Sequence, residues 1–168
     1  MTAFLARRLA AGDHPLNFYL WGAMGSAVTV GLGLALAQPK RRVLVVTGDG
    51  EMLMGLGALA TISVQRPDNL AIAVIDNEHY GETGMQATHT GAGVDLAGIA
   101  NMAGFRTTLT VSAAGECAAA ASELRTAPGP VMVVFKVAAA HDPMVRPSWD
   151  GALLKNRFRQ TLLGSRAA

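Results

Sequence analysis

A carboxylate and an amide oxygen each follow a strongly apolar segment, with a helix-length stretch between them. Asp49, with a glycine on either side, comes soon after the apolar run 43–46, and Asn77 follows the run 70–75. Because parallel strands end at the same edge of a sheet, the two oxygens could converge on one hard cation such as Mg²⁺. The neighbouring glycines would let backbone N–H groups approach an anion closely. This spacing predicts a site for Mg²⁺ and a diphosphate.

The rest of the chain must supply the elements that hold these oxygens. Apolar strands without polar alternation indicate burial on both faces, and strands that alternate with helices predict an α/β fold. We therefore expect a single doubly wound, mostly parallel sheet flanked by helices. Strands are predicted at 43–47, 70–75, 106–109 and 131–137, and helices at 3–11, up to about 37, and at 51–65, 95–103, 113–125 and 149–163.

The 168 residues are expected to form one domain, with a core at about 15–140 and a tail with a helix at 141–168. Residues 78–93 are rich in Gly, Thr and His without a period, which predicts an ordered or lid-like loop. The uncharged stretch 16–37 contains glycines and polar residues, so we expect a buried helix there rather than a membrane span or signal peptide.

Charge and cysteine content bear on nucleic-acid binding and on the redox state of the compartment. A net charge of +2, with no basic run interleaved with aromatics, gives no indication of nucleic-acid binding. The lone Cys117 cannot form a disulfide within the chain, which favours a reducing cytoplasm. Cys117 lies in an Ala-rich helical stretch, and we expect it to be a small core residue.

The Gly-Asp-Gly around Asp49, followed by Asp76-Asn77, resembles the diphosphate-binding domain of thiamine diphosphate (ThDP) enzymes. The family signature ends in an Asn that often follows another Asn, and here Asp76 replaces the first of the pair. The resemblance implies that Asp49 Oδ, Asn77 Oδ and the backbone carbonyl of His79 bind Mg²⁺. A metal site built from these oxygens agrees with the spacing described above.

The same resemblance assigns further residues to the diphosphate of the cofactor. These are Gly48, Gly50, Glu51, Tyr80 and Gly81, and the backbone N–H groups of the last four would hold the phosphate oxygens.

A second part of the resemblance concerns Met24, which stands 25 positions before Asp49 (49 − 24). In ThDP enzymes a large aliphatic side chain at this distance wedges under the cofactor and brings its two rings together. The resemblance implies this role for Met24, whose N–H would donate to the pyrimidine. The Gly22 carbonyl would accept from the 4′-amino group. The proximity of that amino group to the reactive carbon would favour intramolecular proton transfer.

ThDP enzymes also need a Glu carboxylate that activates the cofactor, and in the family it belongs to a separate pyrimidine-binding domain. The stretch before Gly22 is too short for such a domain. We therefore expect a separate α subunit to carry this domain and the activating Glu. The cofactor would lie across the interface of the two polypeptides, in an α₂β₂ or larger assembly.

The loop 77–88 indicates which ThDP enzymes this chain resembles. Its pattern, Asn-x-x-Tyr-Gly-x-Thr-Gly-x-Gln-x-Thr, looks like the β subunit of sulfopyruvate decarboxylase and the corresponding half of phosphonopyruvate decarboxylase. This implies non-oxidative decarboxylation of a small 2-oxo acid, with the cofactor as electron sink. No residue of this chain is assigned a catalytic role with certainty. His79 and His89, and after them His141, are candidates for proton transfer because imidazole titrates near neutral pH.

Other interpretations of the same residues stay open. A carboligase or a non-catalytic, ThDP-binding regulatory subunit would carry the same cofactor site. A 2-oxoacid:ferredoxin oxidoreductase subunit is disfavoured by the single cysteine, and a nicotinamide site by the absence of a GxGxxG motif at 22–25. A sulfonate or phosphonate substrate would need a cation, for which Arg106, Lys136 and Arg146 are candidates, although surface solvation is the better expectation for each.

Overall fold

The computed structural model describes residues 13–140 and 147–164. The chain divides into two compact units, one formed by Met24–His141 and the other by Met1–Ala23 together with Asp142–Ala168. The organisation of the chain as one domain stays a prediction. Three earlier assignments, the helix at 3–11 and the roles of His141 and Arg146, lie outside the described residues.

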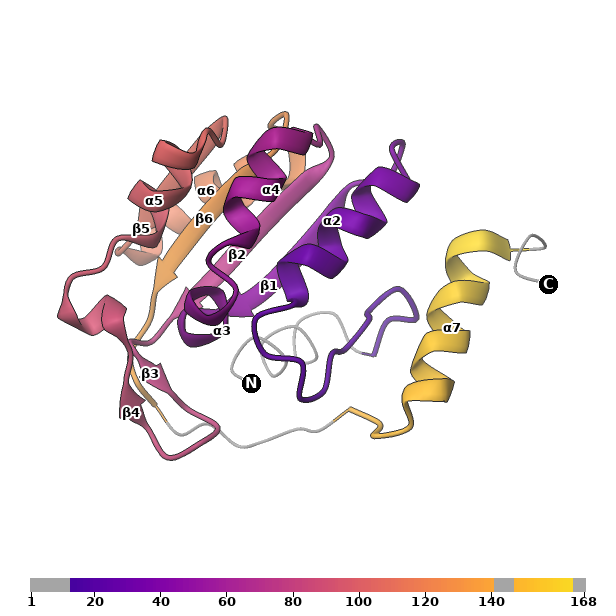
Figure 1. Cartoon of the computed structure of the whole chain (residues 1–168), viewed down its shortest axis with the longest axis horizontal. Coiled ribbons are helices and arrows are strands. Elements are labelled where there is room, and N and C mark those ends of the chain that lie inside the picture. Colours follow the sequence, from indigo (N-terminus) through magenta and orange to yellow (C-terminus); the bar gives the residue numbers. More distant parts are fainter. Residues whose placement is uncertain (1–12, 141–146, 165–168) are drawn as a thin grey trace. The chain divides into compact units, whose positions relative to one another are not determined.

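The larger unit alternates helices and strands (Figure 1). The elements, in chain order, are α2 (Ala27–Ala37), β1 (Val43–Gly48), α3 (Asp49–Met54), α4 (Ala58–Gln65), β2 (Leu70–Asp76), β3 (His79–Tyr80), β4 (Gln86–Ala87), the 3₁₀ turn η1 (His89–Ala92), α5 (Leu96–Ala103), β5 (Thr107–Val111), the 3₁₀ turn η2 (Ala114–Glu116), α6 (Cys117–Thr126) and β6 (Val131–Lys136).

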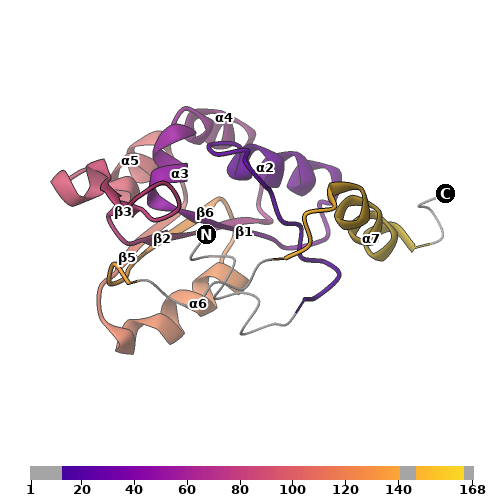
Figure 2. The same cartoon turned by 90° about the horizontal axis from the view of Figure 1, so that it is seen from below.

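Four of these strands form one parallel sheet in the order β1-β2-β6-β5, and β3 and β4 form a separate antiparallel hairpin. Helices α2, α3, α4 and α5 lie on one face of the sheet and α6 on the other (Figure 2). This arrangement confirms the predicted parallel α/β fold. The central strand β2 is buried at nearly every position, as expected of a strand covered on both faces.

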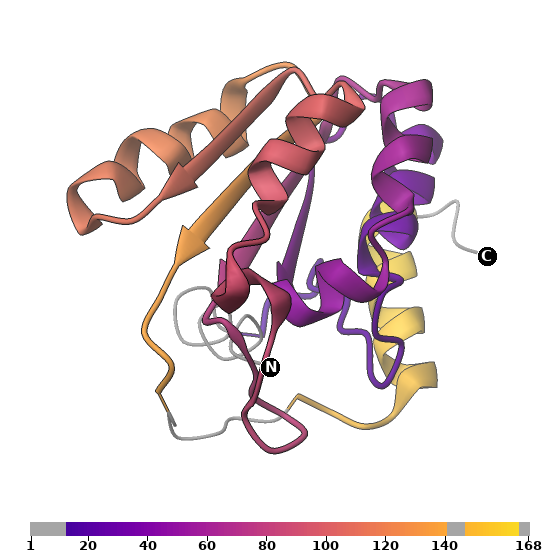
Figure 3. The ribbon, with the colours of Figure 1, turned by 60° about the vertical axis from the view of Figure 1, so that its left-hand side comes forward.

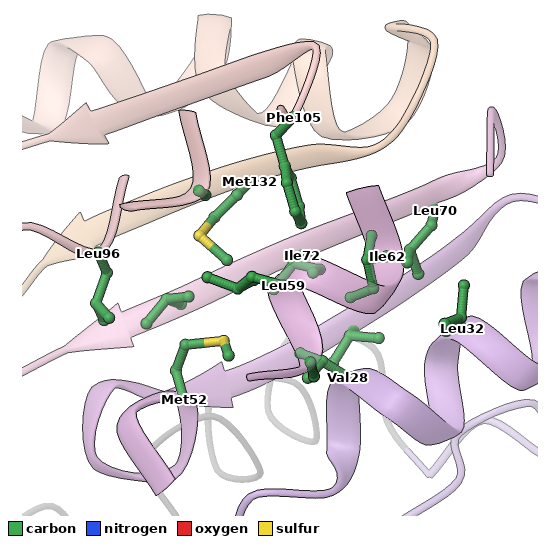
Figure 4. Packing of buried hydrophobic residues seen from close by; sticks show 14 of the residues in the cluster. Val28, Leu32, Met52, Leu59, Ile62, Leu70, Ile72, Leu96, Phe105 and Met132 are labelled. Atoms are coloured by element: carbon green, nitrogen blue, oxygen red, sulfur yellow. The ribbon is translucent and has the colours of Figure 1, made fainter. Parts of the chain in front are cut away.

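The main hydrophobic core lies between the sheet and the layer of four helices. Met52 from α3, Leu59 and Ile62 from α4, Ile72 from β2 and Leu96 from α5 meet there (Figure 4). A smaller cluster packs α6 against the opposite face. The helices that follow β1 and β2 are thus fixed to the sheet by apolar contacts, which hold the ends of those strands in place.

The structure differs from the sequence expectation in the stretch 51–65, which is not one helix. It is interrupted at Gly55–Gly57, which separates α3 from α4. At this break the backbone of Gly25 packs so closely that a Cβ on Gly55 would lie 2.1 Å from the Gly25 carbonyl oxygen. The expected core position of Cys117 is also wrong, because this residue is exposed at the start of α6.

The smaller unit contains α7 (Gly151–Leu163), which begins at Asp150, whose side chain accepts a hydrogen bond from the Leu153 N–H. Trp21 stacks on Trp149 with ring centroids 3.9 Å apart. Arg157 of α7 forms an ion pair with Asp13. These contacts join the two segments of the unit. Within the described part of the chain, none of the helices combines the length and the apolar character that a bilayer span requires.

Candidate functional site

The two candidate metal ligands lie at the ends of neighbouring strands. Strands β1 and β2 pair in parallel with Gly48 opposite Ile75, so Asp49 and Asn77 follow the same edge of the sheet. Both side chains are buried, at 1% and 8% exposure. Helix α3 and the β3–β4 hairpin lie beyond this edge (Figures 1 and 3). The predicted juxtaposition of these two strand ends is therefore present in the fold.

One oxygen of Asp49 lies within hydrogen-bond distance of two buried hydroxyl groups. Asp49 Oδ2 accepts a hydrogen bond from Thr88 Oγ1 at 2.5 Å and lies 3.1 Å from Thr90 Oγ1. The two threonine oxygens are 2.9 Å apart. Because both hydroxyl groups converge on Oδ2, the carboxylate is held in one orientation and Oδ1 is the oxygen left to coordinate a cation.

A second buried carboxylate, Asp76, belongs to the same network. Asp76 Oδ1 lies 2.8 Å from Thr90 Oγ1 and accepts a hydrogen bond from the Glu78 N–H at 3.1 Å. Thr90 has a single hydroxyl proton, so it can donate to Asp76 or to Asp49 but not to both. The buried carboxylates of Asp49 and Asp76 therefore compete for the single hydroxyl proton of Thr90. Buried charge is costly unless it is compensated, and such a pair favours a bound cation.

Lys136 compensates part of this negative charge. It ends β6 directly opposite Asp76, and its Nζ lies 3.1 Å from Asp76 Oδ2 and 2.5 Å from Glu78 Oε1. Partial burial lowers the pKa of Lys136, but hydrogen bonds and charge attraction from Glu78 and Asp76 outweigh it and the pKa lies above its ordinary value. The expectation that Lys136 is only solvated at the surface is therefore wrong. Arg106 is exposed and pairs with Asp68, away from this network.

The turn that follows Asn77 is closed by short-range hydrogen bonds. Asn77 Oδ1 accepts from the His79 N–H at 3.1 Å, and the His79 ring Nδ1 lies 2.9 Å from the Asn77 carbonyl oxygen. The His79 carbonyl accepts from the Gly81 N–H at 3.1 Å. The structure thus pairs a predicted metal ligand with a predicted phosphate donor. Binding of both groups as predicted would replace this hydrogen bond.

Gly50 provides the space that the hairpin needs beside α3. Gly50 is buried, and a Cβ at this position would lie 2.4 Å from Cε1 of Tyr80. The Tyr80 ring therefore packs directly on the backbone of Gly50. This close packing brings together two backbone segments whose N–H groups were assigned to the diphosphate. A side chain at position 50 would separate them.

The segment that carries Met24 is attached to the same region by two contacts. Glu51 accepts hydrogen bonds from Thr47 Oγ1 at 2.6 Å and from the Ala27 N–H, at the start of α2, at 3.3 Å. Gly25 packs against the backbone of α3, as described above. Met24 itself is exposed, at 44%. Gly22 belongs to the smaller unit, and its role stays a prediction.

Sequence reasoning did not assign Asp76, Thr88, Thr90 or Lys136 to the site. Thr88 lies within the loop motif, but a hydroxyl group on a loop gives no periodic signal. Among the described residues, no three His, Cys, Asp or Glu side chains are grouped to hold a metal ion. The candidate ligand set is of another kind, with one carboxylate, one amide and one backbone carbonyl. His79 is half-buried and His89 is exposed.

Comparison with known proteins identifies the family to which this geometry corresponds. Residues 1–135 match the family model described as "Thiamine pyrophosphate enzyme, C-terminal TPP binding domain". The chain is 47% identical over 100 residues to sulfopyruvate decarboxylase subunit beta of Methanocaldococcus jannaschii, which covers 60% of the chain and 53% of the relative. It is 40% identical over 148 residues to phosphonopyruvate decarboxylase of Streptomyces viridochromogenes, which covers 88% of the chain and 37% of the relative.

The chain thus spans about half the length of the first relative and about a third of the second. Among solved structures, the thiamine diphosphate-dependent 4-hydroxybenzoylformate decarboxylase of Rhodococcus jostii RHA1 has a similar fold. The TM-score is 0.60 at 22% identity, over 71% of this chain and 24% of that chain. At this level of identity the likeness concerns the fold alone.

Proposed function

Because the chain belongs to the thiamine pyrophosphate enzymes, with the C-terminal TPP-binding domain of that family, we propose that it is the β subunit of a ThDP- and Mg²⁺-dependent 2-oxo acid decarboxylase. A separate α subunit carries the pyrimidine-binding domain and the activating Glu. The substrate is a small 2-oxo acid of the sulfopyruvate or phosphonopyruvate kind. Two relatives of this chain are named as beta subunits of sulfopyruvate decarboxylase, which supports the division into subunits.

The observation that carries the proposal is the buried, pre-oriented carboxylate of Asp49 beside Asn77. Thr88 and Thr90 occupy Oδ2 of Asp49, so Oδ1 can bind a cation without reorganisation. Mg²⁺ takes oxygen ligands and is commonly held by one or two carboxylates together with substrate phosphates. One carboxylate and one amide oxygen at adjacent strand ends fit that preference. The buried negative charge of Asp49, whose hydrogen-bond partners are neutral hydroxyl groups, also favours a divalent cation.

In this proposal Asp49 Oδ1, Asn77 Oδ1 and the His79 carbonyl bind Mg²⁺. Backbone N–H groups on either side of the Gly50–Tyr80 contact bind the diphosphate, and they belong to Gly50, Glu51, Tyr80 and Gly81. Bound ThDP would supply the electron sink that decarboxylation of a 2-oxo acid requires. Met24, exposed in the turn that precedes α2, would set the conformation of the cofactor.

Among the described histidines, His79 is our first candidate to accept a proton. Its Nδ1 faces the carbonyl oxygen of Asn77, which can only accept, so Nδ1 carries the proton of the neutral ring. Nε2 is then an acceptor and faces away from that hydrogen bond. We assign proton transfer at Nε2 to His79 and keep the exposed His89 as a second candidate at the edge of the site.

The proposed metal site is tested by replacing Asp49 with a residue of equal size. Asp49→Asn retains an oxygen that can accept from Thr88 and Thr90 but removes the negative charge that binds the metal. In the complex with the α subunit, affinity for ThDP in the presence of Mg²⁺, measured by calorimetry, should fall at least about 100-fold, above what loss of an outer partner of a metal ligand usually costs. Unchanged affinity would remove Asp49 from the metal site.

Asp95→Asn is the matched control, because Asp95 is an exposed residue at the start of α5 and Asn begins helices equally well. The same calorimetry should give the wild-type affinity. A second experiment supplies a 2-oxo acid to the same complex with the α subunit that carries the activating Glu. Turnover of a 2-oxo acid to CO₂ and an aldehyde should then appear. A ligated product in the presence of an aldehyde acceptor would instead identify a carboligase.

A further inference from the structure

Lys136 connects the end of β6 to the turn that carries the proposed metal ligands. Its Nζ binds Asp76, the last residue of β2, and Glu78, which lies between Asn77 and His79. We call Lys136 and its two carboxylates, Asp76 and Glu78, the Lys136 clasp. None of the three was assigned as a ligand of the metal or of the cofactor, so the clasp needs an explanation of its own.

Glu78 adopts an unusual backbone conformation. Its φ is +63°, in the left-handed region that favours glycine and strains a residue with a long side chain. The reversal of the chain at this residue separates Asn77 from His79 and turns the backbone into the β3–β4 hairpin. A residue without this conformation at position 78 would give the two proposed ligands a different relative orientation.

Several contacts hold Glu78 in this conformation. Its N–H donates to Asp76 Oδ1 at 3.1 Å, and its carbonyl accepts from the Thr88 N–H at 2.8 Å. Its side chain lies between Lys136 Nζ and the backbone of Gly91, where an added Cβ would come within 3.3 Å of the Glu78 Cβ. The carboxylate of Glu78 is therefore fixed at the point where the turn is strained.

We propose that Lys136 is a positioning residue, which holds the strained turn at Glu78 so that the Asn77 side chain and the His79 carbonyl face the Mg²⁺ site. This inference rests on the proposed function for the identity of the ligand. Lys136 acts through Asp76 and Glu78 and does not touch the metal. Its ammonium group is already bound by two carboxylates, and we do not assign Lys136 to a distal anion of the substrate.

Two substitutions at Glu78 separate positioning from a simple effect of charge. Glu78→Gln and Glu78→Gly both remove the carboxylate and its pair with Lys136. Gln keeps the strain of the left-handed conformation, whereas Gly adopts that conformation freely. A role that depended only on charge near the metal would make the two variants equal. A positioning role makes Gln clearly worse than Gly.

The measurement is calorimetric affinity for ThDP with Mg²⁺, using the whole chain in complex with an α subunit that carries the pyrimidine-binding domain. Loss of an outer partner of a metal ligand commonly costs about 10–100-fold in affinity. We expect Lys136→Met to fall in that range, Glu78→Gln to lose about tenfold and Glu78→Gly to lose no more than about threefold. Equal losses for Gln and Gly, or wild-type affinity for Lys136→Met, would overturn the proposal.

A second measurement, amide hydrogen exchange of the ligand-free chain, does not depend on the cofactor. The amides of residue 78 and of Thr88 should exchange at least about tenfold faster in Lys136→Met and Glu78→Gln than in Glu78→Gly. If the wild-type chain in complex with the α subunit fails to bind Mg²⁺ and ThDP, the proposed function is wrong, and the exchange rates of the ligand-free chain still decide whether the clasp holds the turn. Equal exchange in all variants would refute the clasp.

Arg106→Met serves as the matched control for Lys136→Met. Arg106 also forms an ion pair with an aspartate, Asp68, but both partners are exposed and lie outside the site. The substitution has the same chemical change and should alter neither the affinity for Mg²⁺ and ThDP nor the exchange of Glu78. A similar loss in Arg106→Met would show that removal of any cation weakens binding, which would also contradict the proposal.

Discussion

The two strand ends that form the candidate site are held in different ways. At the end of β1 the backbone of α3 is in close contact with its neighbours, because Gly25 packs on Gly55 and the Tyr80 ring packs on Gly50. At the end of β2 the loop is held by polar contacts. Thr88 donates a hydrogen bond to the buried Asp49, and Thr90 and Lys136 both contact the buried Asp76. The structure of the first region thus depends on the absence of side chains at its glycines, and that of the second depends on hydrogen bonds and charge.

This difference gives the two regions opposite sensitivities. An added methyl group should damage the β1 region, where no space is left for it. Removal of a polar atom at constant volume should damage the β2 region, where buried donors and acceptors would lose their partners. Substitutions of each kind, made in both regions, can therefore confirm the comparison or contradict it.

The largest effect is expected from Gly55→Ala in the β1 region. The new Cβ would lie 2.1 Å from the Gly25 carbonyl oxygen, and both partners are backbone, so the Met24 segment must move away from α3. Overpacking of this kind should lower the free energy of unfolding by about 3 kcal/mol. Urea denaturation measures this loss, and calorimetry should show weaker ThDP binding as well.

Gly57→Ala provides the control two residues away. Gly57 has helical angles, with φ −60° and ψ −21°, and an added Cβ would meet no heavy atom within 4 Å. Alanine should therefore stabilise the chain slightly, by about 0.5 kcal/mol, because it restricts the unfolded state. If the two variants had the same free energy of unfolding, the close contact of Gly25 and Gly55 would not limit the side chain at position 55.

A smaller effect is expected from Thr88→Val in the β2 region, where the volume stays the same. The hydroxyl group that donates to Asp49 Oδ2 is lost, and the buried carboxylate keeps a poorer set of donors. The free energy of unfolding should fall by about 2 kcal/mol. The affinity for Mg²⁺ in the presence of ThDP should fall about tenfold, because the orientation of Asp49 is no longer fixed.

Thr88→Ser separates the hydroxyl group from the methyl group. Serine keeps the donor to Asp49 and loses only a buried methyl, which should cost about 1 kcal/mol of stability. Its affinity for Mg²⁺, measured in the same titration, should stay close to that of the wild type. A serine variant that bound Mg²⁺ as weakly as the valine variant would show that packing, and not the hydroxyl group, matters at this position.

Features set by local sequence patterns could be predicted, whereas features set by contacts between distant residues could not. Strands and most helices follow from apolar runs and their breaks, and the structure confirms that the strands predicted at 43–47, 70–75 and 131–137 lie parallel in one sheet. The break between α3 and α4 was missed, because Gly55 and Gly57 gave only weak signals within a helical pattern. The reason for the break is a tertiary contact with Gly25, which is distant in sequence.

In the site, Asp49 and Asn77 were found because each follows a strand and because the fold brings adjacent parallel strands together. Lys136 could not be found in this way. It lies 60 positions from Asp76 (136 − 76), and its partner is determined by the pairing of β2 with β6, which sequence patterns do not specify. The hydroxyl groups of Thr88 and Thr90 were missed for a similar reason, since their function depends on where an irregular loop lies.

The smallest effect is expected at Glu51, which belongs to the β1 region but is held by hydrogen bonds. Its carboxylate accepts from Thr47 and from the Ala27 N–H, and thereby joins β1 to the start of α2. In Glu51→Gln one of the two acceptor oxygens becomes an NH₂ group. One hydrogen bond is weakened, and the free energy of unfolding should fall by about 1 kcal/mol.

Affinity for ThDP distinguishes Glu51 from a carboxylate that has only a structural role. Glu116 is the control, because its carboxylate also accepts two hydrogen bonds, from the N–H groups of Ser112 and Ala113, and it lies outside the site. Glu116→Gln should cost a similar amount of stability and leave ThDP binding unchanged. Glu51→Gln should weaken binding about fivefold, since one hydrogen bond near 1 kcal/mol holds the Met24 segment. Equal ThDP affinity in the two variants would mean that the close packing of Gly25 on Gly55 positions this segment without help from Glu51.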